Sequence, residues 1–293
     1  MRRLGFLFAS ATLAASTLAA EQRLVLIGGG PRPSRALARL VEWAGGPRAR
    51  VLVITWAASE PRAAFESFQQ DLAPYGPGAV RRSPLAPLSP EDKALLRDQL
   101  AWATAVYFTG GTQDRIMDVL RDRSLLEQMR ARYQEGVVFA GTSAGTAVMS
   151  AIAIIGDGDR TVMNGDEVEV RPGIGLLPGV ILDQHFIRRQ RQNRLFGLVL
   201  KHPELLGVGV DEGTALLVRG NRTAEVVGAS RVMVVEASAD GEAMSVLLLA
   251  PGETYDLKEK KKLARLTVRD TPGPCVVGRS SDPECEAAAS TRR

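Results

Sequence analysis

The chain has 293 residues, of which 45% are hydrophobic and 24% are charged, the balance of a soluble globular protein. Its 37 Lys and Arg residues exceed its 33 Asp and Glu residues by only four, so the charge does not indicate a nucleic-acid-binding protein. The chain contains two histidines, His185 and His202, which excludes a metal site built from several histidines. We expect no metal ion and no cofactor.

The first twenty residues predict a secretory signal peptide over 1–20. Arg2 and Arg3 give a positive start, residues 4–13 form an apolar middle, and residues 17–20 are mostly small. The apolar run is too short for a membrane-spanning helix, so we expect no membrane association. The predicted location is therefore secreted or periplasmic.

From residue 23 onward, short β-rich apolar runs alternate with longer amphipathic segments. The expected strands cover residues 23–27, 50–54, 79–83, 105–108 and 137–140, and the expected helices cover 34–43, 61–72 and 90–102, the last with Ser89 as its N-cap. Strands that alternate with helices predict an α/β domain whose parallel sheet carries helices on both faces.

The pattern changes after residue 155. We expect a hairpin or loop insertion within 157–177, a polar-faced helix over 187–200, and then successive strands with hairpin turns at Gly220-Asn221 and Asp240-Gly241. These elements predict one catalytic domain over residues 21–270, with a sheet that begins parallel and ends in antiparallel C-terminal additions.

Residues 271–293 are rich in proline, serine and small residues, which predicts a loose C-terminal tail. The tail carries both cysteines of the chain, Cys275 and Cys285. In an oxidising compartment these two could close one small disulfide loop.

Three glycines, Gly28-Gly29-Gly30, follow the first expected strand and invite a dinucleotide-binding interpretation. That fingerprint needs a third spaced glycine at position 33, where the chain has Pro33. We therefore interpret the glycines as a turn at the carboxyl edge of the sheet, where a turn can still line a pocket.

The segment GTSAG at 141–145 has the Gly-x-Ser-x-Gly spacing of a serine held on a tight strand-to-helix turn. This makes Ser143 the candidate nucleophile, and a serine nucleophile needs a base. His185 lies between an expected strand and an expected helix, so it can reach the same sheet edge. His202 precedes Pro203 at a helix end and fits a capping role.

The imidazole needs a carboxylate to orient it, and two candidates follow a strand as Asp211-Glu212. Strand alternation points them to opposite sides, so only one can serve. Asp157 and Asp159 are competing candidates. For the developing oxyanion, the expected donors are the backbone N–H of Ala144 and an N–H in the Gly110-Gly111 pair, with Gly111 preferred.

Four arginines lie in the segment 187–195 beside the candidate base. Such a cluster can bind substrate carboxylates through forked hydrogen bonds, or it can form a solvated helix face. Arg188 fits the solvated face, and the residues alone leave the choice open for the other three.

Several segments together resemble the cyanophycinases, which belong to the serine peptidase family that also contains the α-aspartyl dipeptidase called peptidase E. The segments are FTGGTQ at 108–113, GTSAG at 141–145, DQHFIRRQRQNRL at 183–195 and GVGVDEGTA at 207–215. The resemblance implies a class I glutamine amidotransferase-like, flavodoxin-like domain that is often a homodimer.

The resemblance also implies roles for particular residues. Ser143 is the nucleophile, His185 the base, and Glu212 rather than Asp211 the acid. The positions that match the substrate pocket of the family are Gln113, Asp183, Gln184, Arg189, Arg191 and Arg194. The implied substrate is cyanophycin, multi-L-arginyl-poly-L-aspartate, which is cut to β-Asp-Arg dipeptides; other aspartyl peptides are the alternative.

The chain departs from the family pattern in three places: Thr146 stands where these enzymes usually have alanine, and neither the 157–177 insertion nor the tail has an assigned role. An α/β-hydrolase esterase also uses Gly-x-Ser-x-Gly, but it expects the acid before the histidine and an upstream histidine, which this chain lacks. A secreted, catalytically inactive protein that binds acidic peptides is the alternative from another functional class.

Overall fold

The computed structural model describes residues 20–263. The predicted signal peptide, apart from Ala20, and the tail with Cys275 and Cys285 lie outside the described residues. Within them, no helix is both long enough and apolar enough to cross a membrane.

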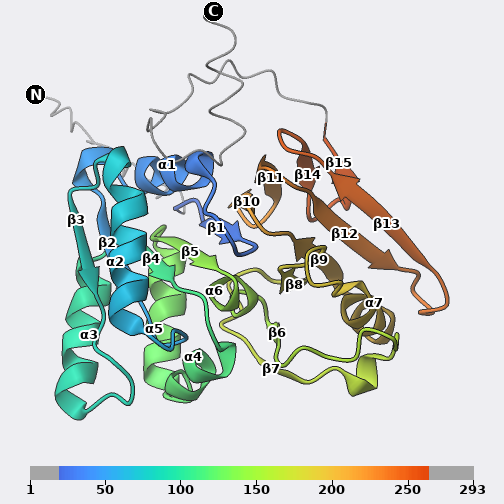
Figure 1. The fold of residues 1–293 in the computed structure, drawn as a ribbon, viewed down its shortest axis with the longest axis horizontal. Coiled ribbons are helices and arrows are strands. Elements are labelled where there is room, and N and C mark those ends of the chain that lie inside the picture. The colour runs from blue at the N-terminus through green and yellow to red at the C-terminus, as the bar shows by residue number, and fades with distance from the viewer. Residues whose placement is uncertain (1–19, 264–293) are drawn as a thin grey trace, which may run out of the picture.

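The larger of two sheets holds nine strands in the described part of the chain, and the five strands at one end of it are parallel (Figure 1). The parallel strands are β1 (Arg23–Ile27), β5 (Val138–Thr142), β4 (Ala105–Phe108), β2 (Arg50–Ile54) and β3 (Ala79–Arg82), in that spatial order. On the other side of β1 the sheet continues through the antiparallel strands β10 (Thr214–Arg219), β11 (Thr223–Gly228), β14 (Thr254–Asp256) and β15 (Lys261–Lys262). The predicted parallel start and antiparallel additions are thus confirmed.

Helices cover both faces of this sheet, as expected. The helices α1 (Ser34–Trp43) and α2 (Pro61–Leu72) pack on one face, against alternate residues such as Val25 and Ile27 of β1. The other face carries α3 (Pro90–Trp102), α4 (Gln113–Val119) and α5 (Arg123–Gln134), which bury Leu24 and Leu26 of the same strand. The period of two in β1 therefore divides its apolar residues between two cores.

The N-cap prediction at Ser89 is confirmed in detail. Its Oγ accepts a hydrogen bond from Asp92 N–H, and the Asp92 carboxylate accepts one from Ser89 N–H, both at 3.1 Å. This reciprocal capping box satisfies two amides at the start of α3.

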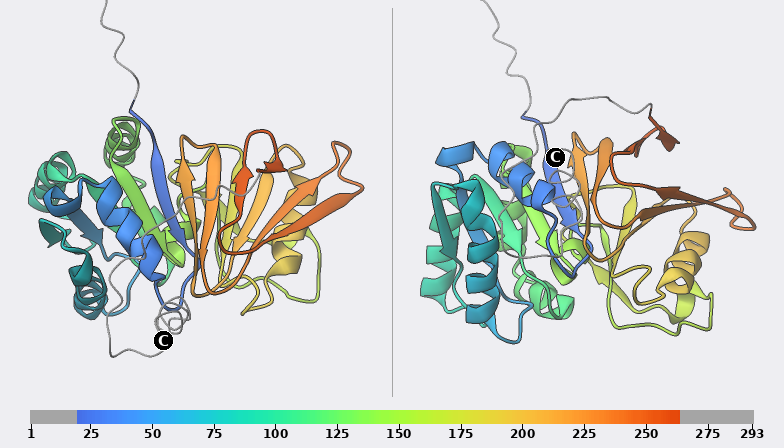
Figure 2. Two further views of the ribbon diagram at one scale, coloured as in Figure 1. Left: turned by 90° about the horizontal axis from the view of Figure 1, so that it is seen from above. Right: turned by 45° about the horizontal axis from the view of Figure 1, so that its top comes forward.

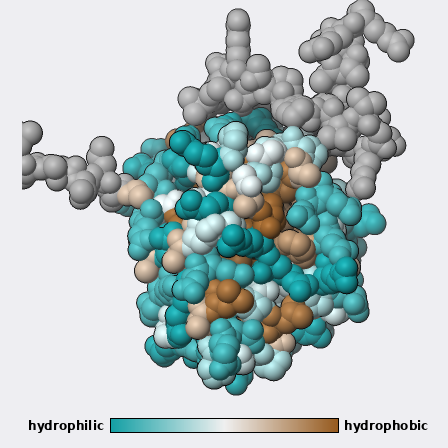
Figure 3. Space-filling view, turned by 90° about the vertical axis from the view of Figure 1, so that its left-hand side faces the viewer, coloured by the Kyte–Doolittle hydropathy of each residue, from teal (hydrophilic) through white to brown (hydrophobic). Residues whose placement is uncertain are grey.

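The outer surface over α2, α3 and β3 is largely hydrophilic with separate apolar patches (Figure 3). Leu85 and Leu95 are exposed in this part of the chain.

The sequence interpretation of a single sheet is wrong, because the described residues form a second sheet of six strands. Its spatial order is β13 (Met244–Leu249), β12 (Val232–Ala237), β9 (Leu206–Val210), β8 (Val180–Gln184), β6 (Ile152–Ile154) and β7 (Val170–Pro172). The chain leaves β9 through Asp211–Gly213 and crosses into β10 of the first sheet, instead of returning in a hairpin. The hairpins predicted at Gly220-Asn221 and Asp240-Gly241 do form.

The second sheet is sandwiched between the first sheet's core and the helix α7 (Gln192–Lys201), which packs on its far face (Figures 1 and 2). The insertion expected within 157–177 is mostly loop, with a 3₁₀ turn at Gly165–Glu167 and the strand β7, which pairs antiparallel with β6 just before the insertion. The two sheets bring the ends of β1, β5, β8 and β9 to one place.

The helix expected over 187–200 starts five residues late. Residues 187–191 form a turn, in which Gln190 has φ of +53°. One carboxylate oxygen of Asp211 accepts hydrogen bonds from the amides of Ile187 (3.1 Å) and Arg188 (2.9 Å), which holds the turn. The polar residues of 187–191 are good helix formers, but they do not form a helix here because the distant Asp211 carboxylate stabilises the turn.

Candidate active site

Ser143 stands on the sharp turn between β5 and α6 (Ala144–Ala147), with φ of +54°. A non-glycine residue with positive φ is strained. The sharp turn that imposes this φ leaves the serine hydroxyl accessible at its tip. The flanking glycines are required by contact: an added Cβ would lie 2.3 Å from the Gly145 backbone at Gly141, and 2.3 Å from Phe108 O at Gly145. The Gly-x-Ser-x-Gly spacing thus has a steric cause here.

His185 follows β8 directly and lies between the serine and a carboxylate. Its Nε2 is 2.8 Å from Ser143 Oγ, and its Nδ1 is 2.5 Å from Glu212 Oε1. The three side chains therefore form a continuous hydrogen-bonded series in the order serine, imidazole, carboxylate. Burial holds the pKa of His185 below its ordinary value; the positive charges of Arg189 and Arg191 act in the same direction, and Glu212 opposes them. A lowered pKa keeps the imidazole neutral, as a general base requires.

The two adjacent carboxylates after β9 have different partners, as strand alternation predicts. Glu212 contacts His185, whereas Asp211 accepts hydrogen bonds from the Ile187 and Arg188 amides and from Ser230 Oγ. The competing acid Asp157 pairs with Arg191 at 2.7 Å instead of with the histidine. Of the alternatives, the geometry therefore brings only Glu212 to His185 within the described residues.

The Gly28–Gly30 turn, interpreted from the sequence as a sheet-edge turn that can line a pocket, is part of this site. The carbonyl of Gly28 accepts a hydrogen bond from His185 N–H at 2.7 Å, and that of Gly29 accepts one from Gly213 N–H at 2.9 Å. A Cβ on Gly29 would lie 2.2 Å from the imidazole Cε1, and one on Gly30 would lie 3.1 Å from Glu212 Cβ. Three consecutive glycines after a buried strand were the signal for this role.

Gly110, Gly111 and Ala144 are the candidate oxyanion donors. In the part of the chain that the structure describes, their three amides have no hydrogen-bond partner. Gly110 lies beside the nucleophile, because an added Cβ there would be 3.7 Å from Ser143 Oγ. Gly111 backs onto Ala57, whose carbonyl oxygen would lie 2.0 Å from an added Cβ.

Gln184 is the polar side chain next to the nucleophile among the expected substrate residues. Its Oε1 lies 3.3 Å from Ser143 Oγ, farther than His185 Nε2. The serine hydroxyl has one proton, so the shorter contact to the imidazole is the productive one. Gln113 is buried and its Nε2 donates to Ile154 O at 2.7 Å, which ties α4 to β6.

The expected arginines differ in what they contact. Arg189 is exposed, in the turn before α7. Arg191 and Arg194 are only 5% and 2% exposed, and both donate hydrogen bonds inside the protein. Asp183, 1% exposed, is the bidentate partner of Arg194.

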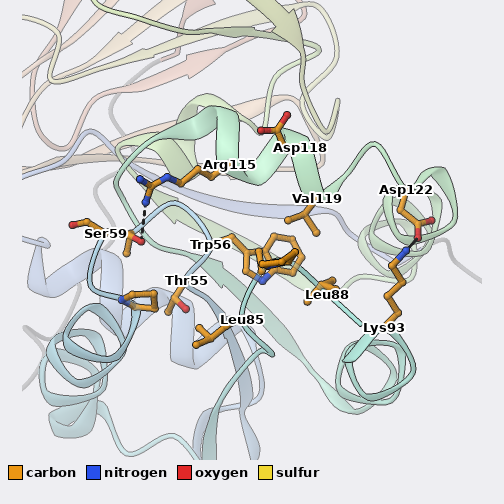
Figure 4. Close-up of a pocket in the computed structure, with 14 residues that line it drawn as sticks. Thr55, Trp56, Ser59, Leu85, Leu88, Lys93, Arg115, Asp118, Val119 and Asp122 are labelled. Carbon is orange, nitrogen blue, oxygen red and sulfur yellow. Dashed lines mark hydrogen bonds and ion pairs between the residues drawn. The ribbon is translucent and has the colours of Figure 1, made fainter. Parts of the chain in front are cut away.

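A separate cavity of 640 Å³ lies between the segment that follows β2 and the helix α4 (Figure 4). Trp56, Leu85, Leu88 and Val119 supply its apolar lining, and Ala58 O accepts a hydrogen bond from Arg115 across its wall (Figure 4). Its other charged groups include Lys93 and Asp122, which pair with each other at 2.9 Å.

A serine on a strained strand-to-helix turn, aligned with an imidazole and a carboxylate at the carboxyl edge of a parallel sheet, defines a site of the serine hydrolase class. The comparisons with known proteins narrow this class. Residues 24–226 match the family model described as peptidase family S51. The chain belongs to this family, and it is a serine-type peptidase.

Two curated relatives agree with the assignment. The cyanophycinase of Geminocystis herdmanii is 35% identical over 211 residues, which are 71% of this chain and 76% of the relative. The cyanophycinase of Trichormus variabilis is 34% identical over 194 residues, 66% of this chain and 65% of the relative. The match thus spans about two thirds of the length of the second relative.

Solved structures support the fold. A peptidase from an acI-B1 actinobacterium gives a TM-score of 0.61 at 25% identity, over 80% of this chain and 96% of that one. A putative peptidase E from Listeria monocytogenes EGD-e gives a TM-score of 0.53 at 15% identity, over 72% and 100% of the two chains. These likenesses confirm the expected flavodoxin-like α/β fold.

The contact between Gly29 and the imidazole predicts that Gly29→Ala inactivates the protein. The new Cβ has no room beside His185, and a displacement of about 1 Å in such a site costs on the order of 10²-fold in rate. The measurement is kcat/KM on a peptide substrate, with thermal unfolding of the same sample.

Gly45→Ala is the matched control, because Gly45 has φ of +110° against +108° for Gly29, and the nearest atom to its added Cβ is 3.9 Å away. Both variants carry the same backbone strain of about 1–3 kcal/mol. Equal activities in the two variants would show that the glycine serves the turn and not the imidazole.

Proposed function

We propose that the protein is an exported serine-type exopeptidase that hydrolyses cyanophycin to β-Asp-Arg dipeptides through a Ser143–His185–Glu212 triad. The single observation that carries the mechanism is the unbroken series of contacts from Ser143 Oγ through the imidazole to Glu212, at 2.8 and 2.5 Å. The likeness to cyanophycinases over about 70% of the chain supports the substrate.

In the proposed reaction, Ser143 gives its proton to His185 Nε2 as its Oγ attacks the peptide carbonyl. The Ala144 amide and one in the Gly110-Gly111 pair stabilise the oxyanion, and Glu212 stabilises the imidazolium. His185 then protonates the leaving amine, and water hydrolyses the acyl-enzyme by the reverse series of proton transfers.

The arrangement around the serine suits a substrate with a free carboxylate. Arg189 is exposed and lies close enough to lower the pKa of His185. A guanidinium in that position can bind the terminal carboxylate of an aspartyl polymer. Gln184 and Gln113, from β8 and α4, are the polar residues proposed to line the remainder of the substrate site.

The decisive experiment is mass spectrometry of the products after mature protein is incubated with cyanophycin. Wild-type protein is expected to release β-Asp-Arg, and Ser143→Ala is expected to lower kcat on the order of 10⁶-fold, the scale for loss of a triad nucleophile. Release of the same dipeptide by Ser143→Ala would remove the serine mechanism.

Labelling by a fluorophosphonate probe separates the alternatives. A wild-type protein that a fluorophosphonate probe labels, but that releases no dipeptide from cyanophycin, would be a peptidase of other aspartyl peptides. A folded wild-type protein that the probe does not label would be a binding protein for acidic peptides. Both results leave the fold assignment intact.

Export is proposed from the charge and hydropathy of residues 1–20. The N-terminal residue of protein isolated from its native host is expected to lie close to Glu21, after removal of the leader. Protein that still begins with Met1 would contradict export.

We also propose a homodimer that forms through β13, the end strand of the second sheet. Val246, Leu247 and Leu248 are 47%, 36% and 45% exposed on this strand. The hairpin of β12 and β13 projects from the body of the protein (Figure 2). An apolar edge strand pairs readily with a second strand. If β13 of two copies paired, each would supply hydrogen-bond partners to the unpaired N–H and C=O groups of the other.

Leu248→Lys is therefore expected to convert a dimer to a monomer in light scattering after size-exclusion chromatography. Leu95→Lys is the control, because Leu95 is 51% exposed but lies on α3, away from this edge. A monomeric wild-type protein at micromolar concentration would contradict this interface.

A further inference from the structure

Arg191 and Arg194 are unlike Arg189 in having their guanidinium groups occupied within the protein. Arg194 Nε donates to Asp183 Oδ2 at 2.7 Å, its Nη2 donates to Asp183 Oδ1, and its Nη1 donates to Gly156 O at 2.8 Å. A planar guanidinium has five N–H donors, and Arg194 makes four hydrogen bonds, all of them to protein acceptors.

Arg191 also makes its hydrogen bonds within the protein, and with Arg194, Asp157 and Asp183 it forms one network. Its Nη1 donates to Gln184 O at 3.0 Å, and its Nη2 donates to Asp157 Oδ1 at 2.7 Å. The hydrogen bond with Arg191 lowers the pKa of Asp157, which keeps that partner ionised. If Arg191 moved to bind a substrate carboxylate, Asp157 and the Gln184 carbonyl would both lose the hydrogen bond that it donates.

The network closes around Gln184. Asp183 Oδ1 accepts a hydrogen bond from Gln184 N–H at 2.8 Å, and Arg191 holds the carbonyl of the peptide that joins Gln184 to His185. That peptide leads into a residue with φ of +50°, a conformation that the chain does not favour locally. The side chain of Gln184 is the one that approaches Ser143 Oγ.

We infer that Arg191 and Arg194, with Asp157 and Asp183, are positioning residues that fix Gln184 and His185 against Ser143, and that they do not bind the substrate carboxylate. The inference rests on the proposed serine mechanism but not on the identity of the peptide. It divides the three expected substrate arginines into one exposed candidate, Arg189, and two that act through other residues.

The charge of Arg191 supplies a readout that a purely structural role would not move. The charged groups that act on His185 are Glu212 after β9, and Arg189 and Arg191 in the turn before α7, with Asp157 and Asp183 as counter-ions of the arginines. Loss of a positive charge raises the pKa of the imidazole, so the protein must reach a higher pH before its base is neutral.

The experiment measures the second-order rate of Ser143 labelling by a fluorophosphonate probe against pH, using the mature protein. The probe carries neither a peptide nor a carboxylate, so at a pH where His185 is already neutral a residue that only binds the substrate does not affect its rate. Arg191→Gln is expected to slow labelling about 10–100-fold and to move the acid limb to higher pH. Arg191→Lys should also be slow, because an ammonium lacks the fork, but its acid limb should stay near that of wild type.

Asp157→Asn tests the same network from a side chain that is 73% exposed, so folding is not at risk. It is expected to slow labelling in the same direction by less than about tenfold, whereas Arg188→Gln, at an exposed neighbouring position, should leave the rate unchanged.

Wild-type labelling rates in both Arg191→Gln and Asp157→Asn, with losses confined to peptides that carry a free carboxylate, would overturn the inference and make Arg191 a substrate-binding residue. A folded wild-type protein that the probe does not label would instead overturn the proposed serine mechanism, and this inference with it.

Discussion

The catalytic distances depend on a main-chain contact between two sheets. The carbonyls of Gly28 and Gly29, just beyond β1, accept hydrogen bonds from the amides of His185 and Gly213, which follow strands of the second sheet. The contact is possible because Gly28 has no side chain: an added Cβ would lie 2.1 Å from Asp211 O. The nucleophile belongs to the first sheet and its base to the second, so any separation of the sheets here would break the triad before it unfolded either core.

Hydrogen bonds to the end of β1 also hold two strained residues in place. Ser143 and His185 both have positive φ, which costs an ordinary residue on the order of 1–3 kcal/mol. Each is held by hydrogen bonds from outside its own segment. His185 N–H donates to Gly28 O at 2.7 Å, Ser143 N–H donates to Ile27 O at 3.0 Å, and Thr146 Oγ1 donates to Ile27 O at 2.7 Å. The threonine that departs from the family pattern thus fastens the nucleophile turn to the end of β1. The strain at the site is therefore offset by hydrogen bonds to the sheets around it.

Sequence reasoning succeeded where local pattern decides structure. The strands and helices of the first half follow from alternation, apolar runs and the Ser89 cap, and Gly-x-Ser-x-Gly indicated Ser143. It failed where distant groups decide. No periodicity assigns β9 and β12 to a second sheet, because each strand is apolar and its partner is a matter of topology. The turn at 187–191 has the composition of a helix, and the carboxylate of Asp211, twenty or more residues away, determines its conformation.

The arginines show the same limit within the site. Their spacing places three guanidinium groups near the base, and spacing alone cannot tell which of them already has a partner. Asp183 has a side chain that is 1% exposed and that pairs with Arg194, as a buried carboxylate needs a paired and hydrogen-bonded cation. Asp183, one residue before Gln184, therefore keeps Arg194 in the interior as its partner, and Asp157 on the neighbouring loop does the same for Arg191. The 157–177 insertion, which has no role that its sequence reveals, enters the site through this ion pair: its first residue anchors the guanidinium that holds the peptide before His185.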